Sequence, residues 1–334
     1  MRFKQSLGNY TVKVTVLIAP MCSSTSVAAT LEMLEAANVL NAANSQSKDK
    51  IFHLETVSLD GKPVQCSGGL TLTPQTSIEM VKQSDLIIVP GFLFSILQLL
   101  PTLKAFIPWL QHHFQNQTTI CASCTGVFML AEAGILNSTL ATTHWFYADE
   151  FKQRYPEVKL QENHTVTEDN NIICSGGGTA GNDLLLHVIR KFGSSELTAE
   201  CAKKLLVDLS PRKQSPYIQL AFNKNHKDTD ILEVQQWLEK HFSEEVNMDT
   251  LANQFGFGLR SFTRRFKEST NLSPIHYLQS LRLEETKRLL ESTKNSFDVI
   301  TYQVGYEDSN SFRRLFKARV GISPGGYRKK FTQA

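Results

Sequence analysis

The sequence predicts an α/β fold for its N-terminal part, a sandwich built on a parallel sheet, followed by an all-α part with two helix-turn-helix motifs. Three observations lead to this prediction. Strand-like and helix-like patterns alternate over the first two thirds of the chain, a block near the C-terminus recurs fifty positions later, and positive charge gathers in that block. A length of 334 residues suits two such domains.

The N-terminal elements form a regular alternation of apolar strands and amphipathic helices. The expected strands are 12–18, 52–58, 86–89 and 118–123, and the first expected helix is 26–41. Because strands that alternate with helices usually pair in parallel, the pattern predicts a sheet covered by helices on both faces.

The segment 92–110 is the one candidate for a membrane span. Pro101, Lys104 and Pro108 interrupt it, so a loop followed by a core helix is expected there instead. No secretory signal pattern precedes Val12, and six cysteines without such a signal favour reduced thiols. We therefore expect a cytoplasmic protein with no membrane contact.

The C-terminal elements are predicted from an internal repeat. Seven residues recur at an offset of fifty: Phe262, Arg264, Phe266, Lys267, Ser273, Pro274 and Tyr277 return as Phe312, Arg314, Phe316, Lys317, Ser323, Pro324 and Tyr327. Each copy reads as a short helix, a turn at Gly256 or Gly305, and a second helix. The expected helices are 250–255 and 260–269 in the first copy, 299–304 and 309–319 in the second, with a connecting helix over 274–291. Asn271 and Gly321 suit left-handed caps at the ends of the second helices.

The second helix of each copy carries a polar face opposite a phenylalanine pair. The polar residues of the first copy are Arg260, Thr263, Arg264 and Lys267, and those of the second are Ser309, Asn310, Arg313, Arg314 and Lys317. Arginine and asparagine can read base edges, and Ser, Thr and Lys commonly reach phosphates. Residues 251–334 hold 15 Lys or Arg against 7 Asp or Glu. Ordinary solvated helices are the alternative, but two copies in register favour double-stranded DNA as the partner.

Residues 229–334 resemble the AraC/XylS family of transcription regulators. The similarity is carried by the strings 261–267, 304–306, 312–317 and 321–324. It implies a seven-helix unit whose two recognition helices enter successive major grooves, with promoter DNA and RNA polymerase as partners and activation as the usual outcome. Two residues depart from the family pattern, since Gly258 replaces a capping Ser and Thr301 replaces a small Ala.

Cys124 stands where the strand 118–123 breaks into a helix. Such a corner can expose a nucleophile, but a buried structural cysteine is the alternative. The surrounding strings 124–136, 141–145 and 175–177 resemble the ThiJ/PfpI superfamily, which has the class I glutamine-amidotransferase-like fold, over about 10–195. The resemblance implies a flavodoxin-like parallel sheet sandwich.

Two departures from the superfamily pattern bear on chemistry. Thr125 stands where its enzymes place a His, and Ser26 stands where they supply a carboxylate. We therefore expect no catalytic residue, no metal and no cofactor. Cys124, Thr125, Ser26 and His144 are predicted to line a ligand pocket. The resemblance implies an amino acid or a quaternary amine as the class of effector.

The expected organisation is a sensing and dimerisation domain over 10–195, a linker with a helix over 196–229, and a DNA-binding domain over 230–334. The predicted function is a homodimeric, ligand-responsive transcription regulator, and the family resemblance implies that it activates transcription. Two alternatives remain at this point. One is a thiol enzyme acting on small carbonyl or amide substrates, and the other is a redox sensor using Cys121 and Cys124.

Overall fold

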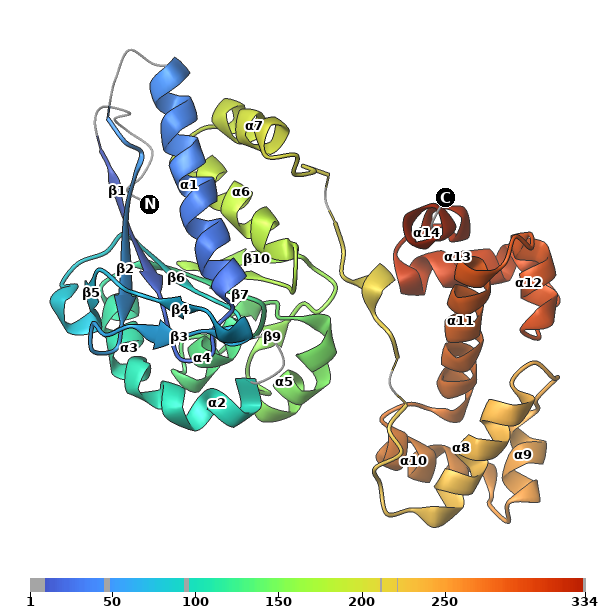
Figure 1. Ribbon diagram of the computed structural model, residues 1–334. Coiled ribbons are helices and arrows are strands. Elements are labelled where there is room, and N and C mark those ends of the chain that lie inside the picture. Colours follow the sequence, from blue (N-terminus) through green and yellow to red (C-terminus); the bar gives the residue numbers. More distant parts are fainter. Residues whose placement is uncertain (1–9, 45–48, 93–95, 211, 221, 333–334) are drawn as a thin grey trace. The chain divides into compact units, whose positions relative to one another are not determined.

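The computed structural model describes residues 10–44, 49–92, 96–210, 212–220 and 222–332. It contains two compact units, one ending at Gln214 and one beginning at Ser215 (Figure 1). Residues 93–95 of the predicted apolar segment, 211 and 221 of the predicted linker, and 333–334 of the predicted DNA-binding domain lie outside the described residues. Within the described residues, no helix has both the length and the apolar composition needed to cross a membrane.

The first unit is built on a seven-stranded sheet with the order β10-β11-β7-β6-β1-β2-β5. Its strands are β1 (Val12–Leu17), β2 (Phe52–Ser58), β5 (Thr76–Ser77), β6 (Leu86–Val89), β7 (Thr119–Ser123), β10 (Val166–Asp169) and β11 (Ile172–Ser175). Neighbouring strands are parallel except the edge strand β10, which is antiparallel to β11. The predicted parallel sheet is confirmed. Two small ladders join β3 (Val64–Gln65) to β4 (Thr71–Leu72) and β8 (Leu140–Ala141) to β9 (Lys159–Leu160).

Helices cover both faces of this sheet (Figure 1). The helices of the first unit are α1 (Ser24–Asn44), α2 (Ile96–Leu103), α3 (Ile107–Gln115), α4 (Val127–Glu132), α5 (Ala148–Arg154), α6 (Ala180–Phe192) and α7 (Ser195–Lys204). Helices α1, α6 and α7 contact one another on one face, and α4 contacts α2 and α3 on the other. The central strand β6 is buried on both faces, since all four of its residues are apolar and buried.

The second unit is all helical, and its helices match the predicted repeat. They are α8 (Thr229–His241), α9 (Met248–Gln254), α10 (Leu259–Thr270), α11 (Pro274–Ser292), α12 (Phe297–Gln303), α13 (Ser309–Val320) and α14 (Pro324–Phe331). The two helix-turn-helix motifs are α9–α10 and α12–α13. Asn271 and Gly321 end the second helices in the left-handed conformation, with φ of 62° and 84°.

Two hydrophobic cores support these motifs, and α11 contributes to both. Phe262 and Phe266 are buried in the first core, and Phe312 and Phe316 are buried in the second. Helix α11 supplies Tyr277 and Leu278 to the first core and Leu283 and Leu290 to the second. The connecting helix is therefore a shared structural element for the two motifs.

The predicted linker 196–229 is divided differently in the structure. Helix α7 packs against α1 and α6, so it is part of the first unit. Residues from Ser215 onward belong to the second unit. The apolar side of α7 explains this packing, because Leu197 and Cys201 are buried against the first unit and would be exposed to solvent in a free linker.

Candidate nucleic-acid interface and ligand site

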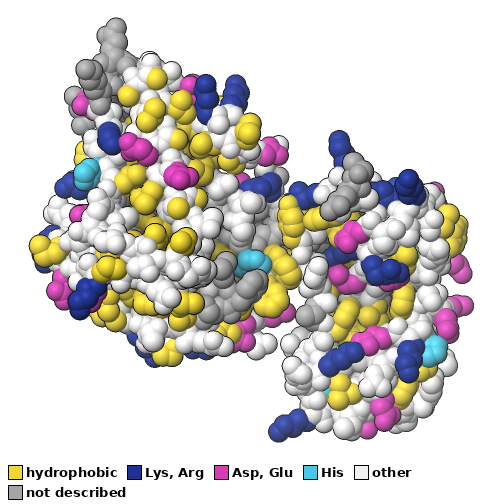
Figure 2. Space-filling model, in the orientation of Figure 1, with side chains coloured by type: hydrophobic (Ala, Val, Ile, Leu, Met, Phe, Trp, Pro, Cys, Tyr) yellow, Lys and Arg dark blue, Asp and Glu magenta, His cyan; other side chains and the backbone are white. Residues whose placement is uncertain are grey.

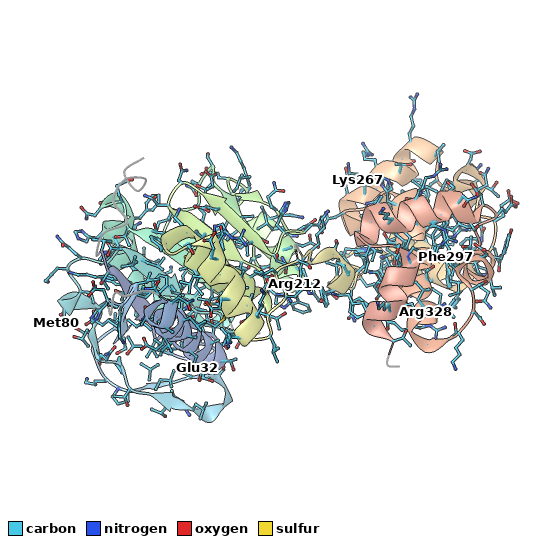
Figure 3. All side chains as sticks on the ribbon, turned by 90° about the horizontal axis from the view of Figure 1, so that it is seen from above. Glu32, Met80, Arg212, Lys267, Phe297 and Arg328 are labelled. Atoms are coloured by element: carbon cyan, nitrogen blue, oxygen red, sulfur yellow. The ribbon has the colours of Figure 1, made fainter. Side chains whose placement is uncertain are left out.

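The polar faces of α10 and α13 are the candidate nucleic-acid interface. Eight of the nine side chains predicted to contact DNA are exposed: Arg260, Thr263, Arg264, Lys267, Asn310, Arg313, Arg314 and Lys317. Ser309, at the start of α13, is half-buried. Figure 2 shows Lys and Arg side chains spread over the visible face of the second unit, and Figure 3 labels Lys267 on it. The buried phenylalanine pairs fix which side of each helix faces outward.

The two recognition helices begin differently. Asp308 caps α13, because its carboxylate accepts hydrogen bonds from the backbone amides of Asn310 and Ser311 at 2.9 and 3.2 Å. Gly258 precedes α10 and offers no side-chain cap. The structure therefore agrees with the sequence that α10 lacks a side-chain cap at Gly258. It leaves the first turn of α10 with amides that a ligand or water must satisfy.

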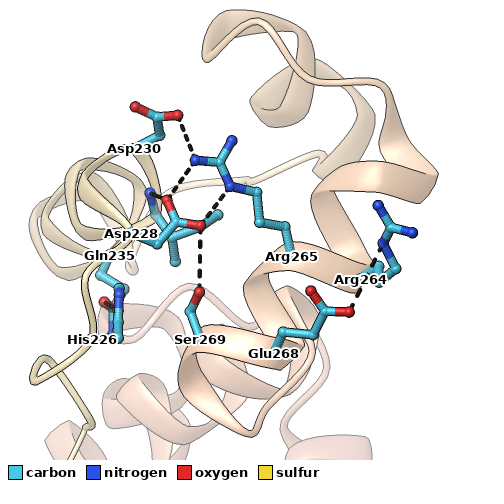
Figure 4. Close-up of polar contacts among 9 residues, drawn as sticks. His226, Asp228, Asp230, Gln235, Arg264, Arg265, Glu268 and Ser269 are labelled. Atoms are coloured by element: carbon cyan, nitrogen blue, oxygen red, sulfur yellow. Dashed lines mark hydrogen bonds and ion pairs between the residues drawn. The ribbon is translucent and has the colours of Figure 1, made fainter.

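Arg265 lies on the recognition helix α10 and is bound to other residues of the protein. Its guanidinium donates to the carboxylates of Asp228 at 2.8 Å and Asp230 at 2.7 Å (Figure 4). Its carbon Cζ also lies 5.1 Å from the centre of the Phe257 ring. Asp228 in turn caps α8 by accepting from the backbone amide of Ile231. Sequence reasoning missed this role of Asp228.

Arg313 has a comparable tie in the second motif. Its guanidinium donates to Asp298 at 3.2 Å and lies 4.7 Å from the centre of the Phe297 ring. Arg264 differs, since its nearest carboxylate, Glu268, is 4.0 Å away and its side chain is 76% exposed. Among the predicted contacts, Arg264 is thus less constrained within the protein than Arg313.

Arg282 on α11 holds the two motifs together. It donates to the carbonyl oxygens of Phe242 at 2.7 Å and Glu244 at 2.8 Å, in the loop after α8. Its guanidinium lies 5.0 Å from the centre of the Tyr306 ring, next to the turn of the second motif. These contacts join the loop after α8 to the turn of the second motif.

The candidate ligand site lies at the carboxyl end of β7. Cys124 follows the strand with φ of 55°, in the left-handed region that non-glycine residues rarely adopt. The turn is crowded, because a Cβ on Gly91 would lie 2.9 Å from Cys124 Cβ and one on Gly126 would lie 2.3 Å from the Pro90 carbonyl oxygen. Two glycines therefore allow this sharp strand-to-helix corner to form.

Burial raises the pKa of the Cys124 thiol above its ordinary value, although hydrogen bonds from Thr125 and the Gly178 backbone oppose the shift. The Ser26 hydroxyl lies 3.0 Å from the Ser123 hydroxyl. Thr125 is fully buried, and its hydroxyl accepts a hydrogen bond from the Phe92 amide at 2.8 Å. Its place in the ligand pocket stays a prediction.

His144 has a structural role at this corner. Its Nδ1 accepts from the backbone amide of Phe146 at 3.1 Å, and burial lowers the pKa of its imidazole. The ring packs so closely on Gly177 that a Cβ there would lie 1.7 Å from His144 Cδ2. No hydrogen bond joins His144 to Cys124 within the described residues. The structure therefore brings the two residues to one region without making them a pair.

Two surface hollows lie elsewhere on the first unit. One, of about 340 Å³, is lined by residues that include Lys13, His53 and Glu55. The other, of about 170 Å³, is lined by residues that include His187 and Arg190. Neither hollow includes any of the four residues predicted to line the ligand pocket.

Comparison with protein families assigns both units. The model described as "DJ-1/PfpI family" matches residues 12–191, more than half of the chain. The chain belongs to the DJ-1/PfpI family. A "Helix-turn-helix domain" model matches residues 251–330, so this DJ-1/PfpI chain carries an AraC-type DNA-binding domain in its second unit. Both resemblances noted in the sequence are confirmed.

Named relatives match most of this chain or one part of it. The transcriptional regulator CdhR of Pseudomonas aeruginosa is 27% identical over 292 residues, which are 87% of this chain and 85% of that protein. The transcriptional activator RhaS of Escherichia coli is 42% identical over 93 residues, 28% of this chain and 34% of that protein. The crystal structure of Drosophila melanogaster DJ-1beta has a TM-score of 0.50 and 20% identity, and the match covers 60% of this chain and all of DJ-1beta. That likeness supports the fold of the first unit.

Proposed function

We propose that this protein is a sequence-specific DNA-binding transcription regulator that responds to a small metabolite through its DJ-1/PfpI unit. The observation that carries the proposal is the pair of recognition helices, α10 and α13, which present polar faces at matching repeat positions. Arg282 and the shared helix α11 join the two motifs within one compact unit. Such a unit suits two successive major grooves on one side of the DNA.

The same proposal includes activation, a homodimer and RNA polymerase as a partner. The likeness of residues in the second unit to an activator, RhaS, supports activation. Dimerisation through the first unit would place two DNA-binding units on neighbouring half-sites and raise affinity by effective concentration. The proposal also includes a cytoplasmic location.

The sensing role is proposed as non-catalytic. Support comes from the raised pKa of Cys124, from the hydroxyl of Ser26 beside that of Ser123, and from the engagement of His144 with the Phe146 amide. A nucleophilic thiol needs a lowered pKa or a neighbouring base. An amino acid or a quaternary amine is the proposed class of effector.

A footprint on the DNA upstream of the protein's own gene tests the proposal. We expect two adjacent protected segments about one helical turn apart on one face of the duplex. When the footprint is repeated with a panel of amino acids and quaternary amines, one compound should change the affinity of the protein for this DNA. A full-length protein that protects no segment would contradict the regulator, and glyoxalase or amidase turnover by that protein would contradict the non-catalytic sensor.

A further inference from the structure

Gln214, the last residue of the first unit, is buried to an unusual degree for a residue in a connection between domains. Its side chain is 4% exposed. The Nε2 amide lies within hydrogen-bond distance of four acceptors, which share its two hydrogens, namely Thr142 Oγ1 at 3.2 Å and the carbonyl oxygens of Thr143, Glu162 and His164 at 2.8, 2.9 and 3.0 Å. The Oε1 atom accepts from the Trp145 amide at 3.3 Å. A polar side chain buried with so many partners is costly to withdraw, because withdrawal leaves those partners unsatisfied.

The slot that holds this side chain borders the candidate ligand site. A Cβ on Gly176 would lie 2.5 Å from the Gln214 carboxamide, and one on Gly177 would strike the ring of His144. Thr143, whose carbonyl oxygen accepts from Gln214, also donates its hydroxyl to the Cys124 carbonyl oxygen at 2.9 Å. Thr143 therefore links Cys124 to Gln214 through two hydrogen bonds.

Arg212 provides a second anchor two residues earlier. Its guanidinium donates to both carboxylate oxygens of Asp183, at 2.6 and 3.1 Å, and to the carbonyl oxygen of Thr179 at 2.9 Å (Figure 3 labels Arg212). Lys213 pairs with His164 in an isolated β-bridge. Three consecutive residues, 212–214, are thus bound to the first unit.

The residues that follow immediately are bound to the second unit. The turn η6 (Ser215–Tyr217) contacts α13, and the Tyr217 ring lies 5.3 Å from that of Phe331. The buried Lys287 donates to the Ile218 carbonyl oxygen at 2.7 Å. Further along, Asp228 holds Arg265 of α10. In the segment 212–228, which we call the strap, described residues after Gln214 therefore contact both recognition helices.

We infer that Gln214 is a latch that docks the strap beside the candidate effector site, and that docking couples this site to the recognition helices. The inference rests on the proposed function and adds the residue through which a ligand signal passes. In the docked state residues 212–214 are held on the first unit and the residues after them on the second, so the connection between the units is short. Release of Gln214 lengthens this connection, which lowers DNA affinity because the two DNA-binding units of a dimer are then held at a lower effective concentration.

Limited trypsin digestion of the full chain tests docking. The bond after the exposed Lys213 should be cut slowly in the wild type and at least about tenfold faster in Gln214→Ala, because cleavage follows the population of the undocked strap. Gln219→Ala is the matched control, since Gln219 is exposed in the same segment and should leave the rate unchanged. Equal cleavage of wild type and Gln214→Ala would overturn the latch.

Hydrogen exchange on the wild type guards against a variant that misfolds. The Gln214 amide donates to the Asn163 carbonyl oxygen at 3.0 Å, so its exchange should be protected alongside that of the neighbouring slot. A freely exchanging Gln214 amide in the folded wild type would also overturn the latch.

A gel-shift titration on the gene's own upstream DNA tests the coupling. Gln214→Ala should bind at least about fivefold more weakly than the wild type, and Gln219→Ala should match the wild type. Faster trypsin cleavage with unchanged DNA affinity would overturn the coupling while docking stands. Failure of the wild type to bind this DNA would instead overturn the proposed function and, with it, the coupling; the trypsin comparison decides docking separately.

Discussion

Arg264 and Arg314 stand at equivalent positions of the two recognition helices, with exposed side chains on the faces opposite the buried phenylalanines. We expect Arg264→Ala and Arg314→Ala each to weaken binding to the specific site by about 1 to 3 kcal/mol, or about 5- to 150-fold, if the arginine reads a base. A gel-shift titration against specific and unrelated DNA measures the loss. Uniform weakening on both DNAs would instead indicate a phosphate contact.

The matched control for these two variants is Arg288→Ala. Arg288 is exposed on the connecting helix α11 and pairs with Glu285 rather than facing outward from a recognition helix. Its removal should leave specific affinity close to that of the wild type. If Arg288→Ala weakens binding as much as the other two variants, the proposed recognition faces are misplaced.

The thiol of Cys124 provides a second test at the scale of one residue. Because its pKa is raised, its thiolate fraction at neutral pH should be smaller than that of a free cysteine, and alkylation should accelerate only above the ordinary pKa of about 8.5. Iodoacetamide labelling across pH, followed by mass spectrometry of the Cys124 peptide, measures this. An apparent pKa below about 8.5 would favour the nucleophile or redox sensor.

The exposed arginines were predictable because helical spacing alone decides which positions lie opposite a buried phenylalanine pair. The partners of Arg265 and Gln214 were not. Asp228 is 37 residues from Arg265, and the acceptors around Gln214 are 50 to 72 residues away from it, so no local pattern joins them. The hydrogen bond of Thr125 was not predictable for a similar reason, since its partner Phe92 is 33 residues away.

At the scale of elements, the two turn glycines meet different demands. Gly256 and Gly305 both have positive φ, 76° and 83°. A Cβ on Gly256 would meet nothing within 4 Å, whereas one on Gly305 would lie 2.5 Å from the Ser243 carbonyl oxygen. The second turn therefore packs against the loop after α8, and the first turn does not.

This difference predicts unequal costs for the same substitution. Gly256→Ala should destabilise the second unit by about 1 to 2 kcal/mol, the cost of a left-handed non-glycine residue. Gly305→Ala should cost more, because the backbone of Ser243 must also move. Urea unfolding of both variants measures the difference. Equal losses of stability would show that the close approach of Gly305 to Ser243 adds nothing to the cost of the substitution.

The helices of the second unit agree with the sequence prediction because stop signals mark their ends. Asn271 and Gly321 end the recognition helices, and the prolines at 274 and 324 begin the next ones. The antiparallel edge strand β10 has no comparable mark. Its direction is decided by pairing with β11 across a short turn, and alternation of strands and helices predicts only the parallel part.

At the scale of the whole molecule, the division at Gln214 and Ser215 changes which fragment should be stable. A fragment from residue 230 begins inside α8 and lacks Asp228, which caps that helix and binds Arg265. It also lacks Phe222, which packs on the first core of the second unit. We expect fragment 215–334 to be more stable than fragment 230–334 by about 2 kcal/mol or more.

Urea unfolding followed by circular dichroism measures this difference, and DNA binding of both fragments provides a second readout. Fragment 215–334 should bind with lower affinity than the full chain, because the first unit no longer brings a second DNA-binding unit to the site. Equal unfolding midpoints for the two fragments would mean that residues 215–229 add no stability.

The anchoring of neighbouring residues to different units has a consequence for how such proteins can be recombined. A splice at 214/215 leaves Gln214 with the slot that receives it and leaves η6 with α13. A splice at 229/230 would carry the strap away from the helices that bind it. Exchange of sensory cassettes between regulators of this architecture should therefore succeed more often at the first junction.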